Sequence, residues 1–144
     1  RQRQMCIRDR YGNETVGYVT KPENWLDFTD PNASPTAVQI CIDPQNIVTL
    51  DFLPKENGLT AEKMARIIMQ KYLNEGVPKE NMSLDTVILN GYEAINLTIL
   101  MNDESLYSAS YIDHNGKIYM LVQEGNADTR MELANVISSW NPDK

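Results

Sequence analysis

The chain has 144 residues and a mass of 16.4 kDa, a length that suits a single domain with one core. Hydrophobic residues make up 42% and charged residues 23%, which excludes the composition of a disordered chain. No apolar run approaches the roughly 18 to 20 residues that cross a bilayer, so no transmembrane segment is expected. The net charge of −7, without a basic patch, argues against nucleic-acid binding.

The first ten residues, RQRQMCIRDR, differ from the rest of the chain. They hold four of the 13 basic residues and one of the 20 acidic residues, and they resemble the peptide obtained when a sequencing adapter is translated. We therefore expect residues 1–10 to be a non-native or disordered leader and residues 11–144 to form a single domain. That domain holds 9 basic and 19 acidic residues, a net charge of −10.

The first half of the domain reads as strands followed by a helix. Alternating side chains predict a strand over residues 12–20, a loop over residues 30–35, which hold two prolines, and a hairpin formed by residues 37–43 and 46–53. Thr60 can cap a helix that Gly76 and Pro78 end. Its apolar face is predicted from the side chains at helical spacing, which are Met64, Ala65, Ile68 and Tyr72.

The second half reads as a four-stranded meander. Asn90-Gly91, the pair best suited to a type I′ turn, separates strands at residues 86–89 and 92–100. The turn at residues 113–116 separates strands at residues 106–113 and 117–124.

A second helix is predicted from Asp128 onward. Its apolar stripe would hold Met131, Ala134, Ile137, Val136 and Trp140, and Asn141-Pro142 would end it. The whole order, βββαββββα, predicts an α+β fold in which two amphipathic helices cover a central antiparallel sheet.

No set of reactive residues stands out. His114 is the sole histidine and lies in a predicted turn, and Cys41 is the one cysteine of the domain, which rules out an internal disulfide there. The carboxylates are scattered over loops and strand ends, so we expect no catalytic residue, no metal ligand and no cofactor. Six aromatic residues could line a groove for a peptide or a glycan, although packing also explains them: Trp25, Phe28, Tyr107, Tyr111, Tyr119 and Trp140.

Several short motifs occur in a recognisable order. They are the Pro-x-x-Trp turn at residues 22–25, Asn-Gly-Tyr-Glu-Ala at 90–94, Gly-Lys-Ile-Tyr at 116–119 and Val-Ile-Ser-Ser-Trp at 136–140. In this order and spacing the chain resembles the PsbP-like fold family. The resemblance implies an α/β/α sandwich whose members act mainly by binding, without catalytic residues. The excess of acidic residues resembles that of bacterial envelope lipoproteins of this family. This resemblance implies an extracytoplasmic location at the cell surface and a lipid anchor on an N-terminus missing here.

Three functions are therefore compared. The first is a non-enzymatic binding or assembly module of the bacterial cell envelope, with an unknown protein, peptide or glycan partner. The second is a small hydrolase or metal-dependent enzyme, which requires several of Cys41, Asp43, Asp51 and His114 to converge in a pocket. The third is an intracellular adaptor that binds a small GTPase, which requires a eukaryotic source.

Overall fold

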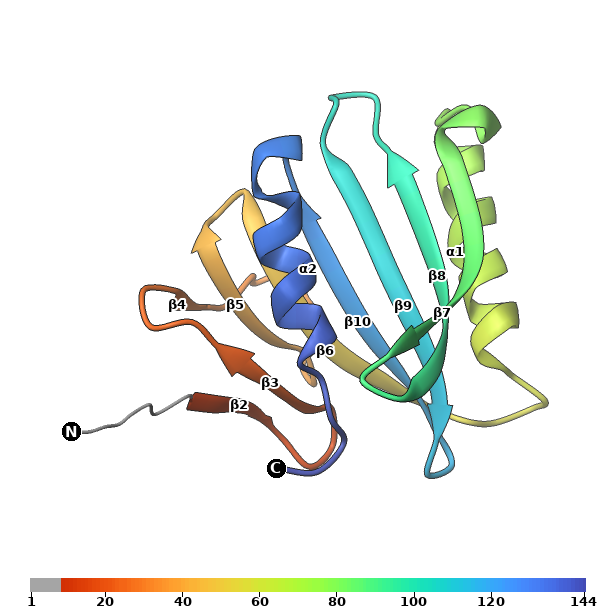
Figure 1. Cartoon of the computed structure of the whole chain (residues 1–144). Helices are drawn as coiled ribbons and strands as arrows, with labels where there is room; N and C mark the ends of the chain where they lie inside the picture. Colours follow the sequence, from red (N-terminus) through yellow and green to blue (C-terminus); the bar gives the residue numbers. More distant parts are fainter. Residues whose placement is uncertain (1–8) are drawn as a thin grey trace.

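The computed structural model describes residues 9–144, which form an α+β fold around one large antiparallel sheet (Figure 1). The two helices are α1 (Ala61–Asn74) and α2 (Arg130–Ser138), with short 3-10 turns η1 (Lys79–Asn81) and η2 (Ala127–Thr129). The strands are β2 (Asp9–Asn13), β3 (Gly17–Lys21), β4 (Leu26–Phe28), β5 (Val38–Asp43), β6 (Asn46–Pro54), β7 (Met82–Leu89), β8 (Tyr92–Leu100), β9 (Leu106–His114) and β10 (Lys117–Gly125).

The large sheet has seven strands in the order β4-β5-β6-β10-β9-β8-β7, and every neighbouring pair is antiparallel. After β6 the chain passes through α1 to the far edge, then returns strand by strand until β10 lies beside β6. A separate two-stranded sheet pairs β2 with β3. Among the described residues no helix is long and apolar enough to cross a membrane.

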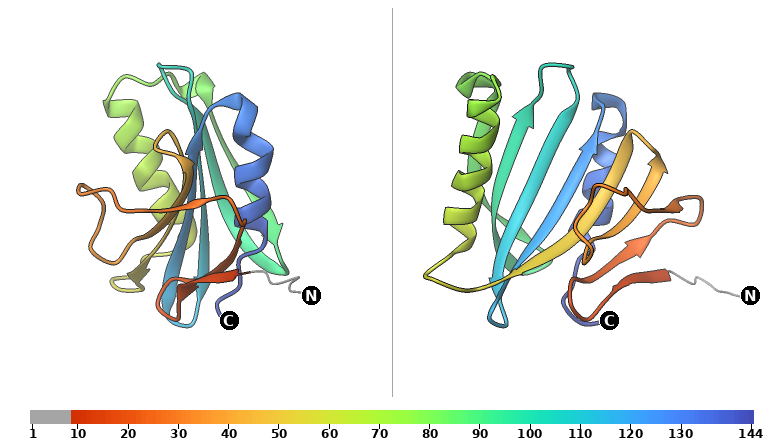
Figure 2. Two further views of the ribbon diagram at one scale, coloured as in Figure 1. Left: turned by 90° about the vertical axis from the view of Figure 1, so that its left-hand side faces the viewer. Right: turned by 180° about the vertical axis from the view of Figure 1, so that it is seen from behind.

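The two helices lie on opposite faces of the sheet (Figure 2). One core cluster joins α2 to the face that carries Ile40, Leu50, Ile112, Tyr119 and Leu121. A second cluster joins α1 to the face that carries Leu97, Ile99, Ala109, Tyr111 and Ile118. The predicted sandwich of two helices around a central antiparallel sheet is confirmed.

The predicted cap and turns also occur. The Thr60 hydroxyl accepts a hydrogen bond from the Lys63 N–H at 3.1 Å, which satisfies one of the free donors at the start of α1. Asn90 and Gly91 have φ values of 49° and 88°, the left-handed pair of a type I′ turn. Asn115 and Gly116, at 54° and 72°, repeat this arrangement between β9 and β10.

The N-terminal part holds more strands than predicted. The single strand expected over residues 12–20 is a hairpin of β2 and β3, and the three-residue strand β4 was not predicted at all. The expected leader lies mostly outside the described residues, but Asp9 and Arg10 belong to β2. The Arg10 guanidinium donates hydrogen bonds to the Thr20 hydroxyl at 2.9 Å and to the Ser139 carbonyl at 3.0 Å.

The predicted apolar stripe at α2 is right for Val136, Ile137 and Trp140, which are buried, and wrong in the first turn of the helix. Met131, expected in the core, is 72% exposed, whereas Leu133, which was left out, is 1% exposed. Val136 and Ile137 are buried beside it. The turn η2 precedes α2, which begins at Arg130. Leu133, Val136 and Ile137 lie at helical spacing on the side that faces the sheet, and Met131 lies on another side of the helix.

Candidate functional site

Each helix covers only half of its face of the sheet. α1 packs on β8 and β9, whereas α2 packs on β10, β6 and β3. The face beneath α1 is therefore left open over β5, β6 and the end of β10 near Glu124. The face beneath α2 is left open over the β7 side of the sheet. A hollow lies on each of these open halves.

The hollow on the α1 face, of about 490 Å³, is the first part of the candidate site, and we call it the tyrosine groove. It lies between α1 and the 30–37 loop, which is on the same side of the sheet as α1 (Figure 2). Its lining includes Tyr72, Tyr107, Tyr111, Met64, Ile68, Met120 and Val122, together with Asp30, Asp51, Lys71 and Glu124. The groove thus combines an aromatic floor with a largely acidic rim.

The tyrosines of this groove are neutral, mutually packed groups. The rings of Tyr72 and Tyr107 are tilted at 54° with centroids 5.3 Å apart. Burial raises the pKa of Tyr111 to about 12 and that of Tyr107 still further. The Lys71 ammonium lies 5.1 Å from the centroid of the Tyr72 ring, a cation-π contact.

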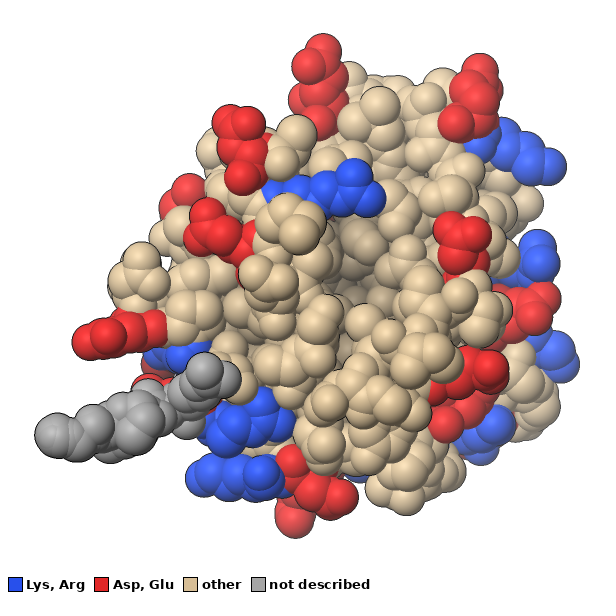
Figure 3. Space-filling model, viewed as in Figure 1, with Lys and Arg blue, Asp and Glu red and all other residues tan. Residues whose placement is uncertain are grey.

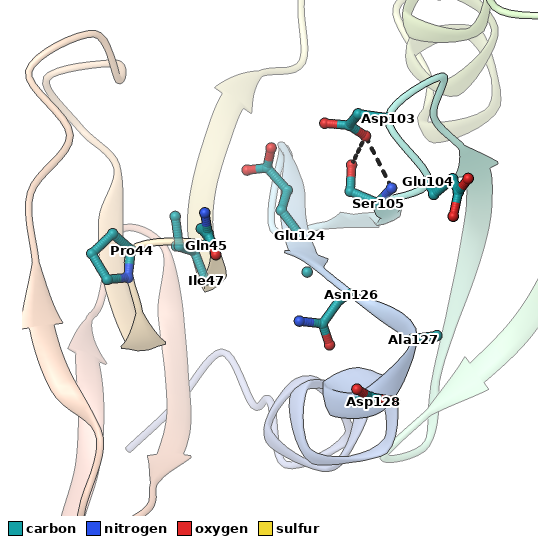
Figure 4. A pocket seen from close by; sticks show the side chains of 11 residues that line it. Pro44, Gln45, Ile47, Asp103, Glu104, Ser105, Glu124, Asn126, Ala127 and Asp128 are labelled. Atoms are coloured by element: carbon teal, nitrogen blue, oxygen red, sulfur yellow. Dashed lines mark hydrogen bonds between the residues drawn. The ribbon is translucent and has the colours of Figure 1, made fainter.

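An acidic hollow of about 610 Å³ forms the second part of the site (Figure 4). It lies between the β5–β6 turn, the β8–β9 loop and the segment after β10. Its lining holds four carboxylates, those of Asp103, Glu104, Glu124 and Asp128, and none of the residues that line it is Lys or Arg. The Ser105 hydroxyl and N–H donate to Asp103 at 2.5 and 2.9 Å, and these bonds lower the pKa of that carboxyl.

Glu124 belongs to both parts of the site. It is exposed to solvent, yet the surrounding atoms desolvate its carboxyl and raise its pKa, as does the negative charge of Asp30, while Lys71 acts in the opposite direction. Because a raised pKa means that the anion is poorly compensated, a cationic group bound beside Glu124 would relieve this cost. The tyrosine groove and the acidic hollow therefore form one electronegative surface.

The six aromatic residues predicted to line a groove are divided between the two faces. Tyr107 and Tyr111 floor the tyrosine groove, and Phe28 lies on the same face because it pairs with Gln39, another residue of that groove. Tyr119, Trp140 and Trp25 instead belong to the core beneath α2, where they are 1%, 0% and 5% exposed. One groove lined by all six does not form.

The residues that an enzyme was predicted to need do not converge. Cys41 is buried, and burial raises the pKa of its thiol, which disfavours the thiolate. The Cys41 side chain lies on the α1 face of the sheet, as Gln39 does, whereas His114 packs on Tyr92 and Tyr119 on the α2 face. Asp43 accepts hydrogen bonds in its own turn from Gln45 and Asn46, and Asp51 accepts one from Thr36. Within residues 9–144 no three His, Cys, Asp or Glu side chains are placed to hold a metal ion.

The acidic hollow was not predicted from the sequence. Its carboxylates come from the β8–β9 loop, from the end of β10 and from η2, segments whose proximity depends on the strand order. No spacing along the chain indicates this assembly.

Comparison with known proteins identifies the fold. The chain matches no protein-family model, and a search of curated proteins gives no significant match. Among solved structures it is similar to cyanobacterial PsbP (CyanoP) from Synechocystis sp. PCC 6803, with a TM-score of 0.63 at 16% identity over 92% of this chain and 91% of that one. The fold is therefore PsbP-like, as the resemblance of the sequence implied.

Two further structures are similar. A protein from Bacteroides thetaiotaomicron aligns with a TM-score of 0.58 at 10% identity, and the alignment covers 89% of this chain and 45% of that protein. LpqN, involved in cell envelope biogenesis of Mycobacterium tuberculosis, aligns with a TM-score of 0.47 at 15% identity over 92% of this chain and 87% of that one. At such identities the likeness concerns the fold alone.

Proposed function

We propose that this protein is a non-enzymatic binding or assembly module of the bacterial cell envelope, and that it binds a basic segment of a protein partner. The observation that carries the proposal is the continuity of the tyrosine groove and the acidic hollow through Glu124. The place in the envelope rests on the sequence resemblance to bacterial envelope lipoproteins of the same fold.

The chemistry of the site favours a cationic and partly apolar partner. Tyrosine faces attract ammonium and guanidinium groups, and Lys71 already occupies such a position over Tyr72. Met64, Met120 and Val122 would contact the methylene stems of Lys or Arg side chains. The carboxylates of the hollow are spread along its walls, which suits several positive charges on an extended segment better than one ion.

The net charge of −10 over residues 11–144 also favours a cationic partner. Opposite charge accelerates association with a basic partner and makes the affinity depend on salt. The enzyme alternative requires several of Cys41, Asp43, Asp51 and His114 to converge, whereas the side chains of Cys41 and His114 lie on opposite faces of the sheet. The adaptor alternative has no observation in its favour.

A fluorescence anisotropy titration tests the binding site. The probe is the labelled peptide acetyl-GRKLGRKLGRK-amide, and its matched control has every Arg and Lys replaced by Glu. We expect saturable binding of the basic peptide alone, weakened by added salt. Glu124→Gln combined with Asp103→Asn should weaken binding about tenfold or more, because two charge-assisted contacts are lost.

Glu14→Gln serves as the control variant. Glu14 is exposed in the β2–β3 turn, beside Lys117 at the start of β10, whereas Glu124 is near the end of that strand. Its loss changes the net charge without touching the site. If this variant weakens binding as much as the site variant does, the peptide responds to overall charge and the site is not the one proposed.

Cell fractionation tests the proposed location. We expect an antibody against the domain to detect the protein in the envelope fraction of its source bacterium, and we expect external protease to degrade it on intact cells. A protein found only in the cytosolic fraction would contradict the envelope proposal but not the peptide-binding site.

A further inference from the structure

A second groove, on the opposite face of the sheet, has a different chemistry. It lies on the open half of the α2 face, with α2 on one side, and has a volume of about 220 Å³. Figure 3 shows it as a hollow near the centre of this face, whose visible floor carries no charged side chain. We call it the hydroxyl groove; its polar lining residues are Asn96, Thr98, Ser108, Ser110, Gln123, Arg130 and Ser138.

Part of this polar lining is internally satisfied. Asn96 donates to the hydroxyls of Ser108 and Ser110 at 3.1 and 3.0 Å, and its side-chain oxygen accepts from Thr98 at 2.8 Å. The hydroxyls of Thr98 and Ser108 lie 3.2 Å apart. These contacts hold the floor of the groove in one arrangement, which reduces the entropy lost when a ligand binds.

Three groups of the lining have hydrogen-bonding capacity that no residue of the range 9–144 uses. The Gln123 side chain is 9% exposed, and while its amide nitrogen donates weakly to the Arg130 carbonyl at 3.4 Å, its oxygen accepts no hydrogen bond there. The Ser110 hydroxyl is 4% exposed and finds no acceptor for its proton in this range. A buried polar atom that makes no hydrogen bond costs free energy. The Gln123 oxygen and the Ser110 hydroxyl proton are therefore available to bind a ligand in the groove.

Arg130 is the third of these groups. Its guanidinium makes no ion pair and no side-chain hydrogen bond with any residue of the described range. Asp85 of β7 pairs with Asn96 of β8 and shares its face of the sheet, but Asp85 does not line the groove. An unpaired arginine at the rim of an uncharged polar groove favours a ligand with one carboxylate.

We infer that the hydroxyl groove binds a small hydroxylated carboxylate, of the chemical class of the sugar acids. Ligand hydroxyls would donate to the Gln123 oxygen and accept from Ser110, and the ligand carboxylate would accept from Arg130. The apolar residues of the lining, such as Leu121 and Ile137, would contact the carbon skeleton. The volume equals that of about seven waters at about 30 Å³ each, which suits a single sugar ring.

The test compares three hydroxylated carboxylates, D-glucuronate, D-galacturonate and D-gluconate, with D-glucose, which lacks the carboxylate. Titrations followed by amide chemical shifts report both affinity and location. We expect at least one of the three to give saturable shifts confined to β7, β8, β9, β10 and α2, with D-glucose binding about tenfold more weakly or worse. Absence of saturable binding by all three, equal binding of D-glucose, or shifts confined to the other face would overturn the inference.

Variants identify the groups responsible. Arg130→Gln should weaken binding of the carboxylate about tenfold or more, and Ser108→Val, which puts a good strand residue into the floor, should block the groove without unfolding β9. Arg66→Gln removes an exposed arginine from α1, which is on the other face, and should leave the affinity unchanged within about twofold. Unchanged affinity in the Arg130 variant would exclude the proposed carboxylate contact.

Discussion

At the scale of single residues, Gly17 occupies a position that does not tolerate a side chain. Its φ of +86° lies in the left-handed region, and a Cβ built there would come 2.3 Å from Nε1 of Trp140. The same indole N–H donates to the Val16 carbonyl at 3.1 Å, and Trp140 is 0% exposed. Glycine at position 17 is therefore what allows the β2–β3 hairpin to close over the end of α2.

The contact between Gly17 and Trp140 leads to a prediction about stability. Gly17→Ala should lower the free energy of unfolding by about 3 kcal/mol or more, since it adds overpacking against a rigid indole to the backbone cost. Gly91→Ala is the matched control, because its φ of +88° is nearly the same and nothing lies within 4 Å of an added Cβ. It should cost only about 1 kcal/mol. Urea unfolding measures both, and equal losses would show that the Trp140 contact is unimportant.

The carboxyl of Glu124 leads to a prediction about how the stability of the protein depends on pH. Its pKa in the folded protein is raised above the unfolded value, mainly by desolvation, so the folded state favours the protonated carboxyl. Stability contributed by this group is therefore present at low pH and is lost as the pH rises through the folded pKa. Glu124→Gln, which mimics the protonated form, should be more stable than the wild type at pH 7, and the difference should disappear at pH values below the ordinary glutamate range.

Thermal unfolding across pH 3 to 8 measures this difference. A variant that is less stable than the wild type at pH 7 would contradict the raised pKa. Together with weaker peptide binding, higher stability would show that Glu124 is kept for binding at a cost in stability, and it would exclude misfolding as the reason for lost binding.

At the scale of elements, local chemistry was sufficient wherever one segment determines its own structure. The cap at Thr60 and the Asn-Gly turns at 90–91 and 115–116 were predicted because each depends on two to four adjacent residues. The strands of the meander were predicted because each has an apolar face and turn residues at its ends, although β7 begins at Met82 and not at the expected Thr86. From these elements the α+β fold follows, since the two helices must each cover a sheet face.

Elements were missed where the structure depends on distant contacts. The hairpin of β2 and β3 is completed by backbone hydrogen bonds between Tyr18 and Asn141, at 2.8 and 2.9 Å, which no local pattern indicates. Met131 of α2 is exposed and Leu133 is buried because the side of the helix that docks on the sheet carries Leu133, Val136 and Ile137. Strand β4 has only three residues and pairs with one neighbour, too little for a period of two to be recognised.

The candidate site was predictable only in part, for the same reason. Tyr107 and Tyr111 were named among six aromatic residues that could line a groove, and at a spacing of four on β9 they share one face of the sheet. Trp140 and Tyr119 have the same sequence character, yet they pack with ring centroids 4.9 Å apart inside the core. Which aromatic residues remain beside a groove depends on where each helix lies, and this is a property of the packed sheet.

At the scale of the whole molecule, the two half-covered faces produce two grooves separated by one sheet. Neighbouring residues of β10 alternate between them: Leu121 and Gln123 line the hydroxyl groove, whereas Val122 and Glu124 line the tyrosine groove. Because β10 pairs with β6 and β9 along its whole length, the strand is held on both sides. It offers no alternative arrangement through which one groove could signal to the other.

The last prediction is therefore that the two sites act independently. If both proposed ligands bind, saturating sugar acid should change the peptide affinity by less than about threefold, the ordinary limit for distant sites without shared partners. Glu124→Gln should likewise leave the affinity for the sugar acid unchanged, and Arg130→Gln the affinity for the peptide. Anisotropy titrations of the peptide with and without sugar acid measure this coupling. A tenfold change in affinity would require a movable element between the two faces of the sheet. Among the described strands β10 alone contributes side chains to both grooves and to the acidic hollow, so hydrogen exchange in β10 would then be measured.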